Sequence, residues 1–300
     1  MASAPEAPGV GVLFNPALIE FVESHADALD YLALIPDRCW TDAGPGAAPR
    51  FETLAAPLAV IERAARRRPT VLHGIGMSLC SARVFDLDYI EHLAEWRRRF
   101  DCAWASEHLS FTRVGGGHEI NASLALPVAY DVEMLELLRP RVGEVQRRLG
   151  CPFLLENNVY YVDIPEQEMS EAEFLNRLMR DTGCGLLLDL HNVLTNARNH
   201  GFDAEAFLRS LDLERVVEIH VAGGDEMMGF HTDSHTGPVD ADVWPLLEAV
   251  APRAANLRGV TFEFHESSWP LLHDAGVLAQ LERARDVLRR CSAPARAVAA

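Results

Sequence analysis

Paired cysteines, long apolar runs and an excess of positive charge are all missing from this chain of 300 residues. No apolar run approaches the roughly 20 residues that a membrane-spanning helix needs. The N-terminus lacks the apolar core of a secretion signal. The formal net charge of -17 argues against nucleic acid as a partner, because phosphate backbones are bound by a basic surface. Composition therefore predicts neither a membrane protein nor a nucleic-acid-binding protein.

The chain has no CxxC pair, although it contains six cysteines. They are spread along the sequence at Cys39, Cys80, Cys102, Cys151, Cys184 and Cys291. The absence of close cysteine pairs weakens the case for a structural zinc site. We therefore expect reduced thiols and a cytoplasmic location.

What the sequence does contain is an alternation of short apolar runs and amphipathic stretches. Eight runs are predicted as strands: Gly9–Phe14, Tyr31–Ile35, Thr70–Gly74, Cys102–His108, Pro152–Glu156, Gly185–Leu190, Val216–Val221 and Gly259–Phe264. A helix is predicted after each strand: Pro16–Ala28, Phe51–Arg67, Leu87–Phe100, Val132–Leu149, Glu171–Thr182, Ala204–Leu211, Ala241–Val250 and Gly276–Arg290. This α/β pattern fits a (β/α)8 TIM barrel, which typically takes about 250 residues. The alternative, a doubly wound open sheet, is disfavoured because no glycine-rich phosphate loop follows the first strand.

The chain shows no convincing linker and no internal repeat beyond the strand–helix rhythm. We therefore predict a single barrel domain over residues 9–290. The ends, residues 1–8 and 292–300, are rich in Ala and Pro and are predicted to be disordered tails.

Six of the apolar runs end in a histidine or a carboxylate. The runs are Thr70–His73, Trp104–His108, Phe153–Asn157, Leu186–Asn192, Val217–His220 and Thr261–Glu266. In a barrel the carboxyl ends of the strands meet at one rim, where active sites lie. The side chains expected at that rim are His73, Glu107, His108, Glu156, Asn157, Asp189, His191, Asn192, His220, Glu263, His265 and Glu266, with Asp233 and His235 added from a loop. Side chains two apart on a strand share a face, so Asp189 with His191, and Glu263 with His265, are expected to point inward together.

So many carboxylates in one cavity favour a metal site. Without compensating cations they would repel one another and take up protons. Imidazole mixed with carboxylate suits iron, manganese or zinc, and a carboxylate can bridge two ions, so a multinuclear centre is plausible. A lone histidine that ends an apolar run is more often structural. Agreement across six strand ends favours the functional interpretation.

At these residues the chain resembles the multinuclear non-haem iron-dependent oxidases, a family that includes methanobactin biosynthesis protein B. The similar segments are His73–Leu79, Ser106–Phe111, Leu154–Asn157, Leu187–Val193, Asn199–Asp203, Ile219–Gly224 and Asp233–Val239. Each segment alone is weak, but their order is specific. The resemblance extends from about Gly9 to Arg290.

The resemblance implies a xylose-isomerase-like TIM barrel with two or three iron ions in mixed-valent form. It also implies an oxidase that uses dioxygen to modify a ribosomally made peptide, frequently at cysteine, with a small partner protein that recognises the peptide leader. The principal metal positions of the family correspond to His73, His108, Glu156, Asp189, His220 and Glu263. Further ligation, or support of the ligands, is implied for His191, Asn192, Asp233 and His235. Residues that we expect to support the ligands from behind are Glu107, Asn157, His191, His265 and Glu266. The residues expected to act in catalysis are His73, His108, Asp189 and Glu263.

Two departures from the family pattern stand out. The family commonly has a histidine where this chain has Gly224, and many members carry Glu-Arg-Asp or Glu-Trp-Asp where this chain has Glu263-Phe264-His265-Glu266. We hypothesise that His265 or Glu266 replaces a missing ligand. Two alternatives stay open: a divalent-metal sugar isomerase or endonuclease-like hydrolase on the same barrel, and a non-catalytic, metal-dependent scaffold of a peptide-modifying complex.

Overall fold

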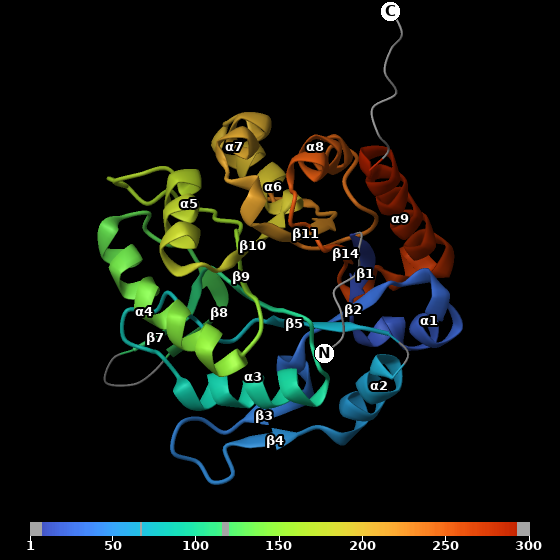
Figure 1. The fold of residues 1–300 in the computed structure, drawn as a ribbon, viewed down its shortest axis with the longest axis horizontal. Helices are drawn as coiled ribbons and strands as arrows, with labels where there is room; N and C mark the ends of the chain where they lie inside the picture. Colours follow the sequence, from blue (N-terminus) through green and yellow to red (C-terminus); the bar gives the residue numbers. More distant parts are fainter. Residues whose placement is uncertain (1–7, 67, 116–119, 293–300) are drawn as a thin grey trace, which may run out of the picture.

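Parallel strands of this protein close into a barrel. The computed structural model describes residues 8–66, 68–115 and 120–292, so the predicted tails lie outside the described residues apart from Pro8 and Ser292. Around the barrel the order is β1 (Gly9–Leu13), β14 (Gly259–Glu263), β11 (Val216–Ala222), β10 (Gly185–Asp189), β9 (Phe153–Glu156), β6 (Ala105–His108), β5 (Thr70–Gly74) and β2 (Tyr31–Leu34). Every neighbouring pair runs parallel, which confirms the predicted barrel (Figure 1).

Helices surround the strands, as Figure 1 shows. The α-helices are α1 (Ile19–Ser24), α2 (Ala55–Ala65), α3 (Leu87–Arg99), α4 (Val132–Leu149), α5 (Glu171–Thr182), α6 (Leu190–His200), α7 (Ala204–Ser210), α8 (Val243–Val250) and α9 (Trp269–Ser292). Short 3₁₀ turns lie at η1 (Pro16–Leu18), η2 (Ala26–Ala28), η3 (Pro36–Cys39), η4 (Leu213–Arg215), η5 (Ala251–Arg253) and η6 (Glu266–Ser268). Both α4 and α5 match their predicted bounds. Each begins at a side-chain cap, Asp131 or Ser170, and ends at a glycine in the left-handed conformation, Gly150 or Gly183.

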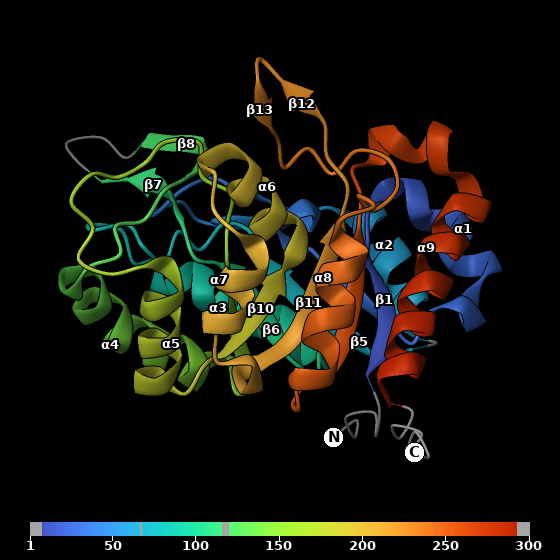
Figure 2. The same ribbon diagram turned by 90° about the horizontal axis from the view of Figure 1, so that it is seen from above.

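Three small β-hairpins lie outside the barrel sheet, and the sequence patterns did not predict them. They are β3 (Trp40–Asp42) with β4 (Phe51–Thr53), β7 (Phe111–Val114) with β8 (Ile120–Leu126), and β12 (Glu226–Met227) with β13 (Phe230–His231). Each follows a barrel strand at its carboxyl end. Figure 2 shows β7–β8 and β12–β13 rising at the same end of the barrel. These hairpins therefore border the rim where the candidate site lies.

Two predicted helices in the first third are wrong in part. The stretch predicted as one helix from Pro16 to Ala28 is broken into η1, α1 and η2. The helix predicted to begin at Phe51 begins at Ala55, because residues 51–53 pair with β3 as a strand.

The prediction for the sixth strand and the helix after it is also corrected. Strand β10 ends at Asp189, and the following helix α6 was missed. The Asp189 side chain accepts a hydrogen bond from the Asn192 amide and caps α6, so the helix begins directly after the strand. The last helix begins at Trp269 rather than Gly276, with a break at His273, whose φ is +47°.

Apolar side chains fill the barrel below the rim. Trp104, Leu154 and Leu187 are almost fully buried and belong to an interior cluster separate from the larger layer between strands and helices. The lower barrel is thus packed, which leaves the upper end for polar side chains. Within the described ranges no helix has the length and apolarity to cross a membrane.

Candidate metal centre

The strand ends place histidines and carboxylates side by side. In the register of the parallel ladder His108 lies opposite Glu156, and Asp189 lies opposite His220. Glu263 lies opposite Ala222, one strand further along. Because parallel strands lie about 4.8 Å apart, side chains that face inward from neighbouring ends meet at ligand distances.

Among the described residues, three groups bring their ligand atoms within 4.8 Å of one another. The groups are His73, His108 and Glu156; Glu156, Asp189 and His220; and Asp189, His235 and Glu263. Glu156 belongs to the first and second groups, and Asp189 belongs to the second and third. The three groups therefore form a continuous row joined by two carboxylates.

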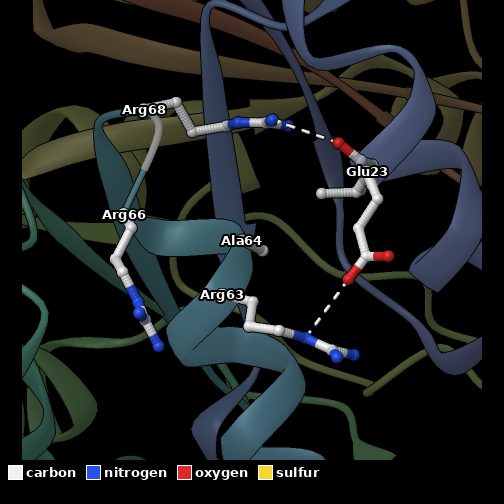
Figure 3. Close-up of a pocket in the computed structure, with 6 residues that line it drawn as sticks. Glu23, Arg63, Ala64, Arg66 and Arg68 are labelled. Carbon is white, nitrogen blue, oxygen red and sulfur yellow. Dashed lines mark hydrogen bonds and ion pairs between the residues drawn. The ribbon is translucent and has the colours of Figure 1, made fainter.

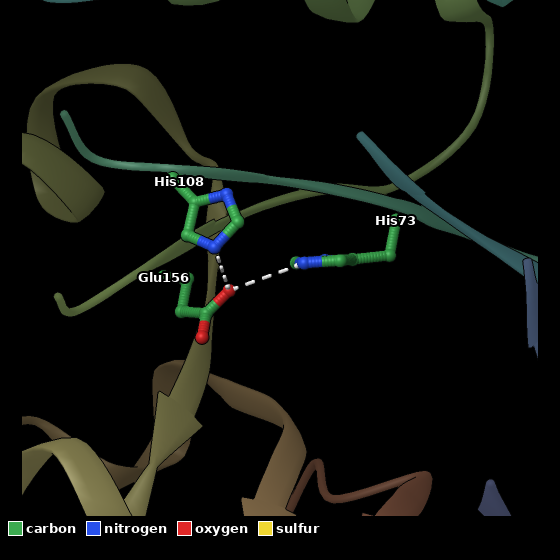
Figure 4. A group of neighbouring side chains, drawn as sticks. All are labelled: His73, His108 and Glu156. Carbon is green, nitrogen blue, oxygen red and sulfur yellow. Dashed lines mark ion pairs between the residues drawn. The ribbon is translucent and has the colours of Figure 1, made fainter. Parts of the chain in front are cut away.

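The first group converges on one oxygen of Glu156 (Figure 4). Its Oε2 lies 3.6 Å from Nε2 of His73 and 3.6 Å from Nε2 of His108. His73 and Glu156 are buried, whereas the His108 side chain is 28% exposed. This group therefore reaches from the barrel interior to the surface.

His220 is the centre of the second group. Its Nδ1 lies 3.9 Å from Oε1 of Glu156 and 4.0 Å from Oδ2 of Asp189. The same Nδ1 lies 3.1 Å from Oε2 of Glu263, which links the second group to the third.

The third group depends on the loop between β13 and α8. His235 contributes Nδ1, which lies 3.3 Å from Oε1 of Glu263, while its Nε2 lies 2.6 Å from Oδ1 of Asp233. His235 has a φ of +50°, a left-handed conformation that is uncommon for residues other than glycine. The loop geometry, not a strand, thus sets the place of this imidazole.

The pKa values show how strongly the groups depend on one another. Burial raises the pKa of Glu156 to about 7, and burial together with Glu156 raises the pKa of Asp189 well above its usual value. Burial alone would lower the pKa of His108 and of His235. Nearby carboxylates outweigh it and raise these values to about 9 and about 10. Without a metal ion, the cluster therefore retains protons at neutral pH.

Several buried oxygens in the row have no hydrogen-bond partner among the described residues. They include Oε2 of Glu156, Oδ2 of Asp189, Oδ1 of Asn192 and Oδ1 of Asp233, the last of which lies 2.6 Å from Nε2 of His235. An unpaired buried polar atom is destabilising, and buried polar atoms in folded proteins are nearly always paired. A row of unpaired oxygens beside imidazoles, without cysteine, fits iron, manganese or zinc. These residues could therefore hold metal ions.

Two asparagines brace the row from behind. Asn157 accepts from the Asp189 amide at 2.9 Å and donates to the Asp189 carbonyl at 3.0 Å, which ties β10 to the end of β9. Asn192 donates to the Asn157 carbonyl at 3.0 Å, while its Oδ1 stays unpaired. Glu107 accepts the amides of Met77 and His108, both at 3.0 Å, and holds the loop after β5. Asn157 thus orients the chain, and Glu107, whose Oε1 also lies 3.5 Å from Nδ1 of His108, supports that ligand from behind.

The inward-pointing pairs inferred from spacing along a strand are not found, because both strands end earlier. His191 lies in the first turn of α6, buried, with Nε2 3.4 Å from the Thr232 carbonyl. That ring approaches Gly224: a Cβ at Gly224 would come within 2.7 Å of the His191 ring and 2.2 Å of the Thr232 carbonyl. The departure at Gly224 therefore has a steric reason, since the loop has no room for a side chain.

His265 and Glu266 lie away from the row. Strand β14 ends at Glu263, and His265 caps η6 with its side chain half exposed and hydrogen-bonded to Ser267 at 2.8 Å. Glu266 pairs with Arg38 at 3.1 Å on the surface. The structure gives no support to the hypothesis that either residue replaces a missing ligand.

Two polar residues near the row were not singled out from the sequence. Ser106 lies 2.9 Å from Nδ1 of His73, and Glu218 lies 3.4 Å from Nε2 of His220. Glu218 stands two residues before His220 on β11, so the period-2 pattern of a strand could have identified it.

Of two pockets in the structure, one lies beside the row of ligand-type side chains, and the other lies away from it. One, of about 380 Å³, is lined by His108 together with Ile75, Ser110 and Leu124 near the β7–β8 hairpin. Another, of about 370 Å³, lies at the far end of α2 near the start of β5, where Arg63 pairs with Glu23 at 3.2 Å (Figure 3). Only the first of these two pockets gives access to the cluster.

Solved structures with the same fold include sugar epimerases. The D-psicose 3-epimerase from Clostridium cellulolyticum H10, solved with D-tagatose, superposes with a TM-score of 0.60 at 12% identity, covering 93% of this chain and 99% of that one. The IOLI protein with a bound zinc atom superposes with a TM-score of 0.56 at 13% identity, covering 95% and 100%. At this identity the likeness shows the xylose-isomerase-like barrel alone.

Relatives in sequence include proteins described as UPF0276. One from Caulobacter vibrioides is 34% identical over 277 residues, 92% of this chain and 92% of that protein. One from Neisseria meningitidis serogroup B is 43% identical over 189 residues, covering 62% of this chain and 66% of that protein. A family model described as RiPP precursor modification enzyme MbnB/TglH/ChrH matches residues 9–289. The chain therefore belongs to this family of enzymes that act on precursors of ribosomally made, modified peptides.

Proposed function

We propose that this protein is a multinuclear iron-dependent oxidase that uses dioxygen to modify a ribosomally made peptide, at a cysteine of that peptide. The observation that carries the proposal is the sharing of Glu156 and Asp189 between neighbouring groups of ligand-type side chains. A shared carboxylate can bridge two ions, which a site for a single ion does not need. Membership of a peptide-modifying family supports the substrate class.

The first-group histidines and Glu156 would hold one ion, and Asp189, His220 and Glu263 would hold its neighbour. His235, with Asp233 behind it, and the unpaired oxygen of Asn192 are the groups available to a third. Bound iron in mixed-valent form would supply electrons to dioxygen and a Lewis-acidic position for a substrate thiolate.

The chain itself controls access. His73, Asp189 and His220 are buried, so a substrate reaches the row at His108, which lines the pocket beside β7–β8. The exposed aliphatic side chains of Ile75 and Leu124 in that pocket suit the residues that flank a modified cysteine. A small partner protein that holds the peptide leader, and a cytoplasmic location in keeping with six free thiols, complete the proposal.

The test uses protein purified without oxygen or chelators. We expect two or three iron ions per chain, oxygen uptake on adding air with the cysteine-containing peptide encoded beside the gene, and a mass change in that peptide. Turnover by the purified protein alone would exclude the scaffold alternative. The matched control is Glu156→Gln in the same assay, which should retain the fold and lose both uptake and mass change.

Other outcomes decide against the proposal. Zinc or manganese alone, with conversion of a sugar, would favour the divalent-metal isomerase. Full iron loading with no oxygen uptake in the presence of the cognate peptide and its leader-binding partner would overturn the oxidase assignment.

A further inference from the structure

Beneath the row, inside the barrel, lies a carboxylate that none of the three groups includes. Glu218 precedes His220 by two residues on β11, so both side chains point into the barrel. Glu218 is 1% exposed and His220 is fully buried. A buried carboxylate in this position needs several partners, since a buried charge is strongly destabilising unless it is paired and hydrogen-bonded.

Glu218 has these partners on both oxygens. Trp104 Nε1 donates to Oε2 at 2.7 Å, and Thr261 Oγ1 donates to Oε1 at 2.5 Å. Tyr31 supplies its hydroxyl to Thr261 Oγ1 at 2.6 Å, which leaves the Thr261 proton for Glu218. An indole N–H can only donate. Both oxygens of Glu218 therefore act as acceptors, as in a carboxylate.

The remaining neighbour of Glu218 is His220. Nε2 of His220 lies 3.4 Å from Oε1 of Glu218, within ion-pair range but without the alignment of a hydrogen bond. Nδ1, on the opposite side of the ring, shares a hydrogen bond of 3.1 Å with Glu263 and faces Glu156 and Asp189. An ion among those three carboxylates would engage Nδ1 and leave the ring hydrogen on Nε2, where Glu218 lies.

We propose that Glu218 is a positioning residue that holds the hydrogen of His220 on Nε2 and so directs Nδ1 to the metal ions. The inference rests on the metal centre proposed above, but not on iron or on any oxidation. Glu218 does not touch substrate or metal ion; it acts through His220 alone.

His73 provides a contrast on the other side of the row. Its Nδ1 contacts the Ser106 hydroxyl at 2.9 Å, and Ser106 in turn donates to the Leu72 carbonyl at 3.3 Å. Its Nε2 faces Glu156. The two histidines thus present different nitrogens, His73 with a neutral partner and His220 with a charged one. A charged partner makes an imidazole a stronger ligand, so the ion at His220 should be held more firmly.

The experiment compares Glu218→Gln with Trp104→Phe, loaded with ferrous iron under anaerobic conditions. Both variants disturb the hydrogen bonds under the row, but only the first removes the charged partner of His220. We expect Glu218→Gln to release iron to a chelator about 10- to 100-fold faster than the wild type. Trp104→Phe should lower the melting temperature and release iron at the wild-type rate. Ser106→Ala should have a smaller effect on release than Glu218→Gln.

Equal iron release from Glu218→Gln and the wild type, or equally fast release from Trp104→Phe and Glu218→Gln, would overturn the inference. If the wild-type chain binds no metal ion, the proposed function fails and this inference fails with it. If the wild-type chain binds ions and Glu218→Gln releases them at the wild-type rate, the inference about Glu218 fails alone.

Discussion

The inner and outer parts of the ligand row are built in different ways. The inner residues, His73, Glu156, Asp189 and His220, stand on barrel strands with side chains at most 3% exposed. The outer residues, Asp233 and His235, stand on a loop and are 28% and 23% exposed. Main-chain ladders on both sides fix the inner residues, whereas the outer pair depends on one left-handed residue. The inner part is therefore preorganised for ions, and the outer part is not.

In the outer part, an ion pair within the protein competes with metal for the imidazole of His235. Nε2 of His235 is already 2.6 Å from Asp233, and its Nδ1 faces Glu263 at 3.3 Å. In the inner part the unpaired oxygens of Glu156 and Asp189 lie 3.6 to 4.0 Å from the imidazole nitrogens that they face. An ion in the inner part satisfies atoms that otherwise lack a partner. We expect the inner positions to fill first and the outer position last.

The largest effect is predicted for Glu156→Gln. Glutamine keeps the shape of the side chain but cannot bridge two ions, so both inner ions should be lost, and peptide oxidation should fall by at least about 100-fold. Because burial raises the pKa of Glu156 to about 7, the charge is unfavourable in the metal-free protein, and the variant should melt no lower than the wild type without metal. Elemental analysis and calorimetry measure the two expectations.

The control for that variant is Glu266→Gln, a carboxylate at the same rim that pairs with Arg38 on the surface. It should leave metal content and activity unchanged. If Glu156→Gln kept its full metal content, the shared-carboxylate arrangement would be wrong.

A second test concerns the junction of the inner and outer parts. Asp189 caps α6 through Oδ1 and offers the unpaired Oδ2 to the row. Asparagine is an equally good cap, so Asp189→Asn should retain the stability of metal-free protein while it loses metal from the second and third groups. Asp189→Ala should lose the same metal and about 1 kcal/mol of stability as well. Equal metal content in Asp189→Asn and the wild type would show that the Asp189 charge is not needed to bind metal and that the residue serves as a helix cap.

Much of the inner part follows from the sequence. Short apolar runs that end in His73, His108, Glu156, Asp189, His220 and Glu263 require only strand order and parallel pairing to converge. Helices such as α4 and α5 were also predicted well, because capping residues and left-handed glycines mark their ends.

The errors occur where one residue has two roles. Asp189 ends a strand and caps a helix at once, so the apolar run Leu186–Leu190 hid the start of α6 and placed His191 on the wrong element. His265 was likewise counted with a strand although it begins η6. The strands of β3–β4 and β12–β13 have only two or three residues, which is too short for a periodic pattern in the sequence. His235 shows the same limit, because its place follows from a loop conformation.

A smaller effect is predicted for His235→Asn. Asparagine tolerates the left-handed backbone, so the loop should keep its course while the imidazole is lost. Only the third group should lose metal, by at most one ion per chain, and the inner ions should stay. Elemental analysis before and after brief dialysis against chelator distinguishes the two parts. Loss of all metal from this variant would show that the outer loop supports the whole row.

The smallest predicted effect is a difference in the pH dependence of metal binding between the inner and outer parts. The metal-free pKa is about 9 for His108 and about 10 for His235, and both imidazoles must lose a proton to bind metal. Affinity should therefore rise with pH up to these values and fall as the solution is acidified. Because the outer position lies on a partly exposed loop rather than on barrel strands, acidification should release the outer ion first. Metal titrations at pH 6, 7 and 8, with proton release measured in two buffers, test the order. Simultaneous loss of all ions would contradict a difference between the inner and outer parts.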